Sequence, residues 1–149
     1  MSGTQLEERV IESLDRSLVA YNEGKQEFFD EFAKDAMIFT AESKDPIRGR
    51  DDYREKYLPA LTAQKRQKTI LGRNMQVVGD KAVVAQTARI AEGDSTVDVS
   101  QTIVYGLTDE GLKVLQMHTA PLKAASNGSS VEIVNERISP VAEVLGVAQ

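Results

Sequence analysis

The chain has 149 residues, 41% hydrophobic and 28% charged, a balance typical of one soluble globular domain. Its formal net charge of −5 disfavours nucleic acid and anionic membranes as partners, and no apolar run approaches the roughly 20 residues of a membrane-spanning helix. With no cysteine and one histidine, the composition predicts no disulfide, no thiol nucleophile and no metal site, and we expect a cytoplasmic protein without a cofactor.

The first part of the chain is predicted to form two helices. Thr4–Glu7 (TQLE) has the spacing of a capping box, and apolar residues then recur on one helical face as far as Tyr21. Gly24 suits the left-handed residue that follows a helix. The segment 28–32 holds three of the four phenylalanines, and we interpret this second, short helix as core rather than as a ligand cage.

A first strand over 36–41 and a short bridging strand over 47–49 are expected next. Asp51 and Asp52 are placed where acidic residues favour the start of a third helix, and Pro59 should kink or shorten it. The basic run 65–68 (KRQK) is interpreted as the solvated end of this helix, where cations complement the helix dipole.

Four strands are predicted to follow, rich in Val, Ile, Thr and Met and separated by short turn signals: 69–78, 81–91, 96–107 and 112–119. Links this short join antiparallel neighbours, because a parallel crossover needs a dozen or more residues. Neither face of these strands carries many charges. We therefore expect helices on one face of the sheet and a second subunit, most simply in a homodimer, on the outer face.

After Pro121 the composition changes. Residues 123–130 (KAASNGSS) have the small, polar side chains of a linker. The later residues predict an edge strand and a short helix, an arm toward a partner subunit, or partial disorder. We expect a domain over 1–121 and an extension over 122–149.

This order of elements resembles that of the nuclear transport factor 2-like (SnoaL-like) superfamily. Ala20–Gly24 (AYNEG) resembles the family's end of helix one, Ile47–Arg50 (IRGR) its entry to helix three, and Val78–Ala82 (VGDKA) a strand turn. The resemblance covers about residues 5–121. It implies an α+β fold of the cystatin-type cone, in which a curved antiparallel sheet packs against three N-terminal helices and encloses a pocket.

Within the superfamily, residues 70–90 are most similar to the association domain of calcium/calmodulin-dependent protein kinases. The resemblance implies a pocket role for Arg89, whereas a second pocket arginine of that domain falls where this chain has Ile103. A buried arginine needs a carboxylate or an anionic ligand. Arg89 is therefore either a ligand contact or one half of an internal ion pair.

The resemblance also suggests where catalysis would occur. The base and the tyrosine donor of the ketosteroid isomerase type fall near Thr40 and Ser17, which lack the required groups, so this chain is not expected to be an isomerase of that type. His118, with an ordinary pKa near neutrality, and Asp45 are the remaining catalytic candidates. Each has a structural alternative: a local hydrogen bond at a strand end for His118, and a turn before Pro46 for Asp45.

Three functions stay open. The first is an oligomeric binding domain for a small polar, anionic or aromatic molecule. The second is an assembly module without a ligand, and the third is a SnoaL-like isomerase, cyclase or hydratase that uses His118 or Asp45. The predicted ligand contacts have polar side chains that could orient a ligand: a guanidinium, phenol hydroxyls, an imidazole and an amide. They are Arg89, Tyr105, His118, Tyr57, Tyr53 and Gln101.

Overall fold

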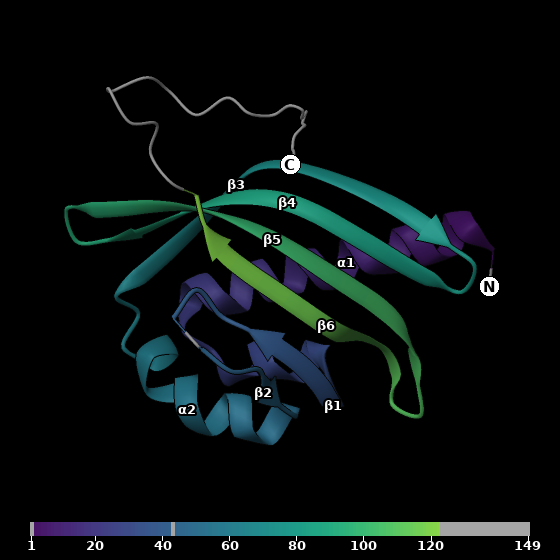
Figure 1. Ribbon diagram of the computed structural model, residues 1–149, viewed down its shortest axis with the longest axis horizontal. Coiled ribbons are helices and arrows are strands. Elements are labelled where there is room, and N and C mark those ends of the chain that lie inside the picture. Colours follow the sequence, from purple (N-terminus) through teal and green to yellow (C-terminus); the bar gives the residue numbers. More distant parts are fainter. Residues whose placement is uncertain (1, 43, 123–149) are drawn as a thin grey trace.

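The computed structural model describes residues 2–42 and 44–122, and the predicted linker and extension after residue 122 lie outside this range. Both α-helices lie on the same side of a curved, six-stranded sheet with the order β2-β1-β6-β5-β4-β3 (Figure 1). In chain order the elements are α1 (Gly3–Glu23), a 3-10 helix η1 (Gln26–Glu31), β1 (Phe32–Phe39), β2 (Ile47–Arg48), α2 (Arg50–Thr62), β3 (Arg66–Val78), β4 (Lys81–Glu92), β5 (Ser95–Thr108) and β6 (Gly111–Pro121). The predicted α+β architecture is confirmed.

The N-cap of helix α1 lies two residues before the predicted cap. Ser2 is the N-cap, its Oγ accepts a hydrogen bond from the Gln5 backbone N–H at 3.1 Å, and Gln5 Oε1 accepts from the Ser2 N–H at 2.8 Å. The prediction at Thr4 was wrong because the same spacing of hydroxyl and long polar side chain occurs in both places. The helix ends at Gly24 as predicted, with φ at 70°.

Gly24 is predicted to be much less tolerant of a side chain than other turn glycines. A Cβ atom there would lie 2.5 Å from Gln64 Cγ and 2.8 Å from the Leu61 carbonyl oxygen, whereas at Gly79, with a similar φ of 62°, it would meet nothing within 4 Å. Gly24→Ala should lower the free energy of unfolding by about 2–3 kcal/mol and Gly79→Ala by about 1 kcal/mol. Urea denaturation of both variants measures the difference, and equal losses would show that only backbone strain matters.

The three hairpins of the sheet, β3–β4, β4–β5 and β5–β6, are antiparallel as predicted. Strand β1 pairs with β6 in parallel, with a register shift between Phe32 and Met37, so the sheet is mixed rather than wholly antiparallel. No short link joins β1 to β6, and hairpin geometry therefore does not fix their relative direction.

Strand β3 starts at Arg66, three residues before the predicted strand. The basic run 65–68 is therefore not a helix end, and this interpretation was wrong. Helix α2 stops at Thr62, and Gln64 takes a positive φ of 53° that turns the chain into the sheet. Alternation along β3 then sends Arg66 and Lys68 to the same face of the sheet.

Phe28 and Phe29 of η1 and Phe32 of β1 form the core, as predicted. Phe28, Phe29 and Phe32 are 4%, 1% and 2% exposed. Each packs against Tyr53 of α2, with ring centroids 5.2–6.2 Å apart. This aromatic cluster joins the helices to the inner face of the sheet, which is the face that the helices cover.

Alternation along β5 separates the two faces of the sheet. Val99, Gln101, Ile103 and Tyr105 are buried on the inner face, whereas Ser100, Thr102 and Val104 on the outer face are exposed or half-buried. No described helix packs on the outer face (Figure 1). The predicted division of β5 into two faces is therefore correct.

Candidate functional site

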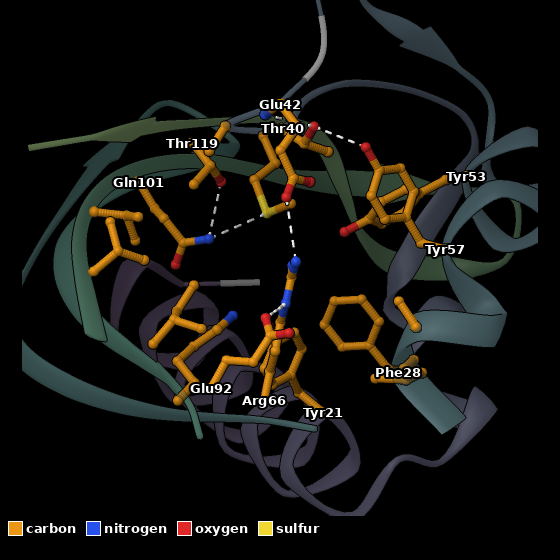
Figure 2. A pocket seen from close by; sticks show the side chains of 18 of the residues that line it. Tyr21, Phe28, Thr40, Glu42, Tyr53, Tyr57, Arg66, Glu92, Gln101 and Thr119 are labelled. Carbon is orange, nitrogen blue, oxygen red and sulfur yellow. Dashed lines mark hydrogen bonds and ion pairs between the residues drawn. The ribbon is translucent and has the colours of Figure 1, made fainter. Parts of the chain in front are cut away.

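A cavity of about 260 Å³ lies between the helices and the inner face of the sheet (Figure 2). One wall is aromatic and comes from α1, η1 and α2: Tyr21, Phe28, Phe29, Tyr53 and Tyr57. The other wall belongs to the sheet and is mainly apolar: Ile90, Val97, Val99, Gln101, Met117 and Thr119. Cavities that bind small molecules are built in this way, with apolar walls and a few polar groups that orient the ligand.

Two tyrosines of the aromatic wall, Tyr53 and Tyr21, are protonated at neutral pH. Burial raises the pKa of Tyr53 far above its ordinary value, and it also raises the pKa of Tyr21. The hydroxyl of Tyr57 lies 2.9 Å from Thr40 Oγ1. The wall therefore presents neutral phenols, which can donate hydrogen bonds.

A row of polar side chains crosses the inner face of the sheet from β3 to β6. Arg73 Nε donates to Gln86 Oε1 at 2.9 Å, and Gln86 Nε2 donates to Gln101 Oε1 at 2.8 Å. Gln101 Nε2 then donates to Thr119 Oγ1 at 3.0 Å (Figure 2). Because the Thr119 oxygen accepts from Gln101, its own O–H is directed elsewhere and is available to a molecule in the cavity.

A second polar network lies beside a smaller cavity of about 30 Å³, which shares four lining residues with the main cavity and which we call its extension. Tyr105 is one of the residues that line this extension. Ser13 Oγ lies 2.9 Å from the Tyr105 hydroxyl and donates to Glu31 Oε1 at 2.7 Å. Arg16 donates two hydrogen bonds of 3.0 Å to the same carboxylate. Burial raises the pKa of Tyr105 to about 12, so this residue stays protonated and hydrogen-bonded to Ser13.

Lys68 is the cation of the cavity that has no acidic partner. Its Nζ lies 4.2 Å from the centroid of the Tyr21 ring, and none of the ion pairs among the described residues involves it. Burial, and secondarily the positive charge of Arg73, lower the pKa of Lys68 to about 8. An amine with this pKa is present in both protonated and neutral forms at physiological pH.

The backbone of Lys68 is fixed by the C-terminal end of α1. Asn22 Nδ2 donates to the Lys68 carbonyl oxygen at 3.0 Å, and the Lys68 N–H donates to Asn22 Oδ1 at 2.7 Å. Strand β3 lies at the edge of the sheet, so these bonds use backbone groups that have no neighbouring strand. The amine is therefore carried by a firmly held segment.

Arg66 lies between two carboxylates that line the same cavity (Figure 2). Its Nε is 2.9 Å from Glu92 Oε1, and its Nη2 is 3.2 Å from Glu42 Oε2. All three side chains are more than a third exposed. The charge of Arg66 is thus compensated within the protein, in contrast to that of Lys68.

Four of the six predicted ligand contacts meet at this site. Tyr53, Tyr57 and Gln101 line the main cavity, and Tyr105 lines its extension together with Gln101. They come from α2 and β5, which are far apart in sequence. Their shared location agrees with the sequence patterns, because tyrosines spaced four residues apart share one side of a helix and alternate residues share one side of a strand.

Arg89 and His118 lie on the outer face of the sheet. Arg89 makes an ion pair with Asp98, at 2.8 Å from Nε to Oδ1. Of the two expected roles, ligand contact and internal ion pair, the structure shows an ion pair, but on the surface of the protein rather than in its interior. His118 is exposed and packs edge-to-face on Phe39 at 5.2 Å between ring centroids. Their neighbours Ile90 and Thr119 face the cavity, so strand alternation directs Arg89 and His118 away from it.

Asp45 is exposed in the segment before β2 and does not line the cavity. Neither catalytic candidate therefore reaches the cavity. Among residues 2–42 and 44–122, no group of acidic or histidine side chains could hold a metal ion, and no helix has the length and apolar character needed to cross a membrane.

Lys68 and Arg66 were not among the predicted site residues, because the basic run was interpreted as the end of a helix. One signal could have found them: in RQK the two cations are separated by one residue, which places both on one face of a strand. Tyr21 lines the cavity but was not among the six predicted ligand contacts. Thr119 was missed because its neighbour His118 was chosen as the site residue of this strand, and strand alternation places the two on opposite faces.

No family model matches the sequence, and no curated protein matches it. Solved structures do match. A nuclear transport factor 2-like protein of unknown function from Pseudomonas putida KT2440 superposes with a TM-score of 0.73 at 14% identity, over 91% of this chain and 99% of that one. A nuclear transport factor 2-like protein with a cystatin-like fold from Novosphingobium aromaticivorans has a TM-score of 0.68 at 13% identity, over 84% and 87% of the two chains.

A third structure is a candidate calcium/calmodulin-dependent protein kinase II association domain from Xanthomonas campestris. It has a TM-score of 0.67 at 21% identity and covers 78% of this chain and 88% of that one. At these identities the likeness shows a common fold, in agreement with the fold expected from the sequence. Function has to be argued from the cavity itself.

Proposed function

We propose that this chain, which has the nuclear transport factor 2-like fold, binds a small molecule in the cavity between its helices and its sheet. The proposed ligand is largely apolar or aromatic and carries one carbonyl or carboxylate oxygen. The observation that carries the proposal is Lys68, a half-buried cation that lines the cavity without an acidic partner.

The polar groups of the cavity are mainly hydrogen-bond donors. Lys68 has three N–H bonds, and the hydroxyl of Thr119 is free to donate because its oxygen already accepts from Gln101. The carboxylates that line the cavity, Glu42 and Glu92, both bind Arg66. A ligand oxygen near Lys68 would therefore supply the acceptor that the protein does not provide there.

The size and walls of the cavity favour a compact, flat ligand. Its volume of about 260 Å³ is slightly below the range of typical small-molecule sites, roughly 300–1,000 Å³. Five aromatic rings face it from the helices. Aromatic walls stabilise flat apolar ligands through ring contacts beyond the area that they bury.

Binding of an aryl carboxylate should depend on Lys68. With 2-naphthoate as the probe, Lys68→Met should weaken binding by a factor of about 10–100, because a hydrogen bond to a charged group contributes about 1.5–3 kcal/mol. Lys65→Met, at an exposed position three residues away, is the matched control and should bind as the unmodified chain does. Isothermal titration calorimetry measures all three affinities, and equal affinity of the two variants would contradict the role of Lys68.

We further propose that two copies of the chain associate through the outer face of the sheet. No described element covers this face, and the charged pair Arg89–Asp98 on it is internally neutralised. The similarity to a candidate association domain supports this assembly. Association through the outer face and ligand binding can occur together, because the cavity lies on the other side of the sheet.

The centre of the outer face offers a direct test. Thr102 is exposed there and lies opposite both Ala85 and His118 in the strand register. In a dimer of this kind, Thr102→Glu would bury two carboxylates against each other, which disfavours association. Light scattering after size exclusion should show a dimer that becomes a monomer in this variant, while Thr4→Glu on exposed α1 stays dimeric. A monomeric unmodified chain would refute the assembly.

A further inference from the structure

We propose that the amine of Lys68 forms a reversible imine with an aldehyde or ketone bound in the cavity. This inference rests on the proposed binding function and narrows its ligand class to carbonyl compounds.

The position of Lys68 suits an attacking group. The residue lines both the main cavity and its smaller extension. Nζ lies 4.2 Å from the centroid of the Tyr21 ring and 6.0 Å from that of Phe28. Asn22 holds the backbone of Lys68 at both its N–H and its carbonyl oxygen. A carbonyl carbon between the aromatic wall and the sheet would therefore meet an amine on a rigid support.

The surroundings of Lys68 also raise the fraction of the neutral amine, which is the reactive form. Burial is the main reason that its pKa falls to about 8, and Arg73 on the same strand adds to the effect. Glu42 and Glu92, which would restore the charged form, bind Arg66 instead. At pH 7 the neutral fraction rises from about 0.03% for an ordinary lysine to about 10%.

The reaction balances without a co-reactant. The nitrogen lone pair attacks the carbonyl carbon, a C–N bond forms, and the carbonyl π electrons move to oxygen. One amine proton is transferred to that oxygen and gives a carbinolamine. The C–O bond then breaks, and the hydroxyl leaves as water with the second amine proton. Thr119 and Tyr57, whose hydroxyls line the same cavity, are suited to hydrogen-bond the oxygen as negative charge develops on it.

Reductive trapping tests the inference directly. The full chain is incubated with 2-naphthaldehyde and sodium cyanoborohydride at pH 7, and the modified lysine is identified by peptide mass spectrometry. We expect one adduct per chain, on Lys68, formed at least about 30-fold faster than on exposed Lys65, because the neutral fraction of Lys68 is larger. Lys68→Arg keeps the charge and should lose the adduct, whereas Lys65→Arg should keep it. Labelling spread evenly over the lysines would overturn the inference, and the unmodified chain alone is enough to show it.

The pH dependence gives a second readout. Trapping at Lys68 should increase between pH 6 and 9 with a midpoint near 8, because its pKa is about 8. The other charged or titratable groups that line the cavity or its extension are Tyr21 of α1, Tyr53 and Tyr57 of α2, Glu42, Arg66 and Arg73 of β3, Glu92 of β4 and Tyr105 of β5. A midpoint above 10 would show an ordinary surface amine.

Binding of 2-naphthoate to the same preparation separates this inference from the proposed function. A chain that binds 2-naphthoate in the cavity but gives no adduct at Lys68 refutes the imine and leaves the binding function intact. A chain that neither binds 2-naphthoate nor traps the aldehyde refutes both.

Discussion

Replacing Phe29 with alanine is expected to lower the free energy of unfolding by about 3–5 kcal/mol. Phe29 is 1% exposed and packs against Phe28 and Tyr53, each at 5.2 Å between ring centroids. It belongs both to the core and to the wall of the cavity. Its removal would leave a void between η1 and α2 that the surrounding rings cannot fill. Because a domain of this size has only about 5–15 kcal/mol of stability, the loss is a large share of the total.

Chemical denaturation followed by circular dichroism measures this effect. Phe39→Ala is the matched control, because Phe39 is half-buried on the outer face, where it packs on His118. We expect it to cost less than half as much as Phe29→Ala. If the two variants lose the same stability, the aromatic cluster is not the centre of the core.

Glu31→Gln is expected to lower the free energy of unfolding by about 1–3 kcal/mol at pH 7. The carboxylate accepts hydrogen bonds from Ser13 and from two nitrogens of Arg16, and an amide cannot replace all three. Ser13 also contacts Tyr105, so the substitution disturbs the link between α1 and β5. Glu27→Gln, at an exposed position on the same 3-10 helix, should change stability by less than about 0.5 kcal/mol.

The stabilisation of the fold by Glu31 should decrease as the pH falls. Burial acts to raise the pKa of this carboxyl, but hydrogen bonds from Arg16 and Ser13, together with the charge of Arg16, outweigh burial and lower it. A lowered pKa in the folded state means that the stabilisation is complete above the ordinary pKa of 4.5 and is lost as the pH falls through the folded value. Denaturation at pH 7 and at pH 3 should show a smaller difference between Glu31→Gln and the unmodified chain at pH 3. An undiminished difference would mean that the charge of Glu31 does not stabilise the fold.

The order of the elements and most of their bounds could be predicted from the sequence, because local patterns determine them. Turn residues between long strands predict hairpins, and a glycine after an apolar helical face predicts the end of α1. The parallel pairing of β1 with β6 has no such local signal, since more than seventy residues separate the two strands. The start of β3 was missed because a basic run suits both a helix end and an edge strand.

The candidate site was predicted in part for a similar reason. Alternation divides the residues of β4 and β5 into two sets, and the long apolar residues beside Gln101 and Tyr105 indicate the inner face of β5. The alternation of β4 is less decisive, because small residues occupy both of its faces. Arg89 was expected in a pocket because of the resemblance to the association domain, and the alternation of β4 did not contradict this. In the structure its neighbour Ile90 lines the cavity. The pKa of Lys68 depends on its burial, and its Nζ lies near the rings of Tyr21 from α1 and Phe28 from η1, a tertiary arrangement that no local pattern encodes.

The measurement that tests the central claim most directly is methyl NMR of the chain during titration with 2-naphthoate. Methyl groups of Ile90, Val99 and Met117 line the cavity, and those of Val83 and Val104 lie on the outer face and serve as internal controls. The account predicts that the cavity methyl resonances shift and that the outer-face resonances do not. It also predicts that the shifts are lost or greatly weakened in Lys68→Met. No shift of the cavity methyls at millimolar probe, or shifts confined to the outer face, would contradict a binding site between the helices and the sheet.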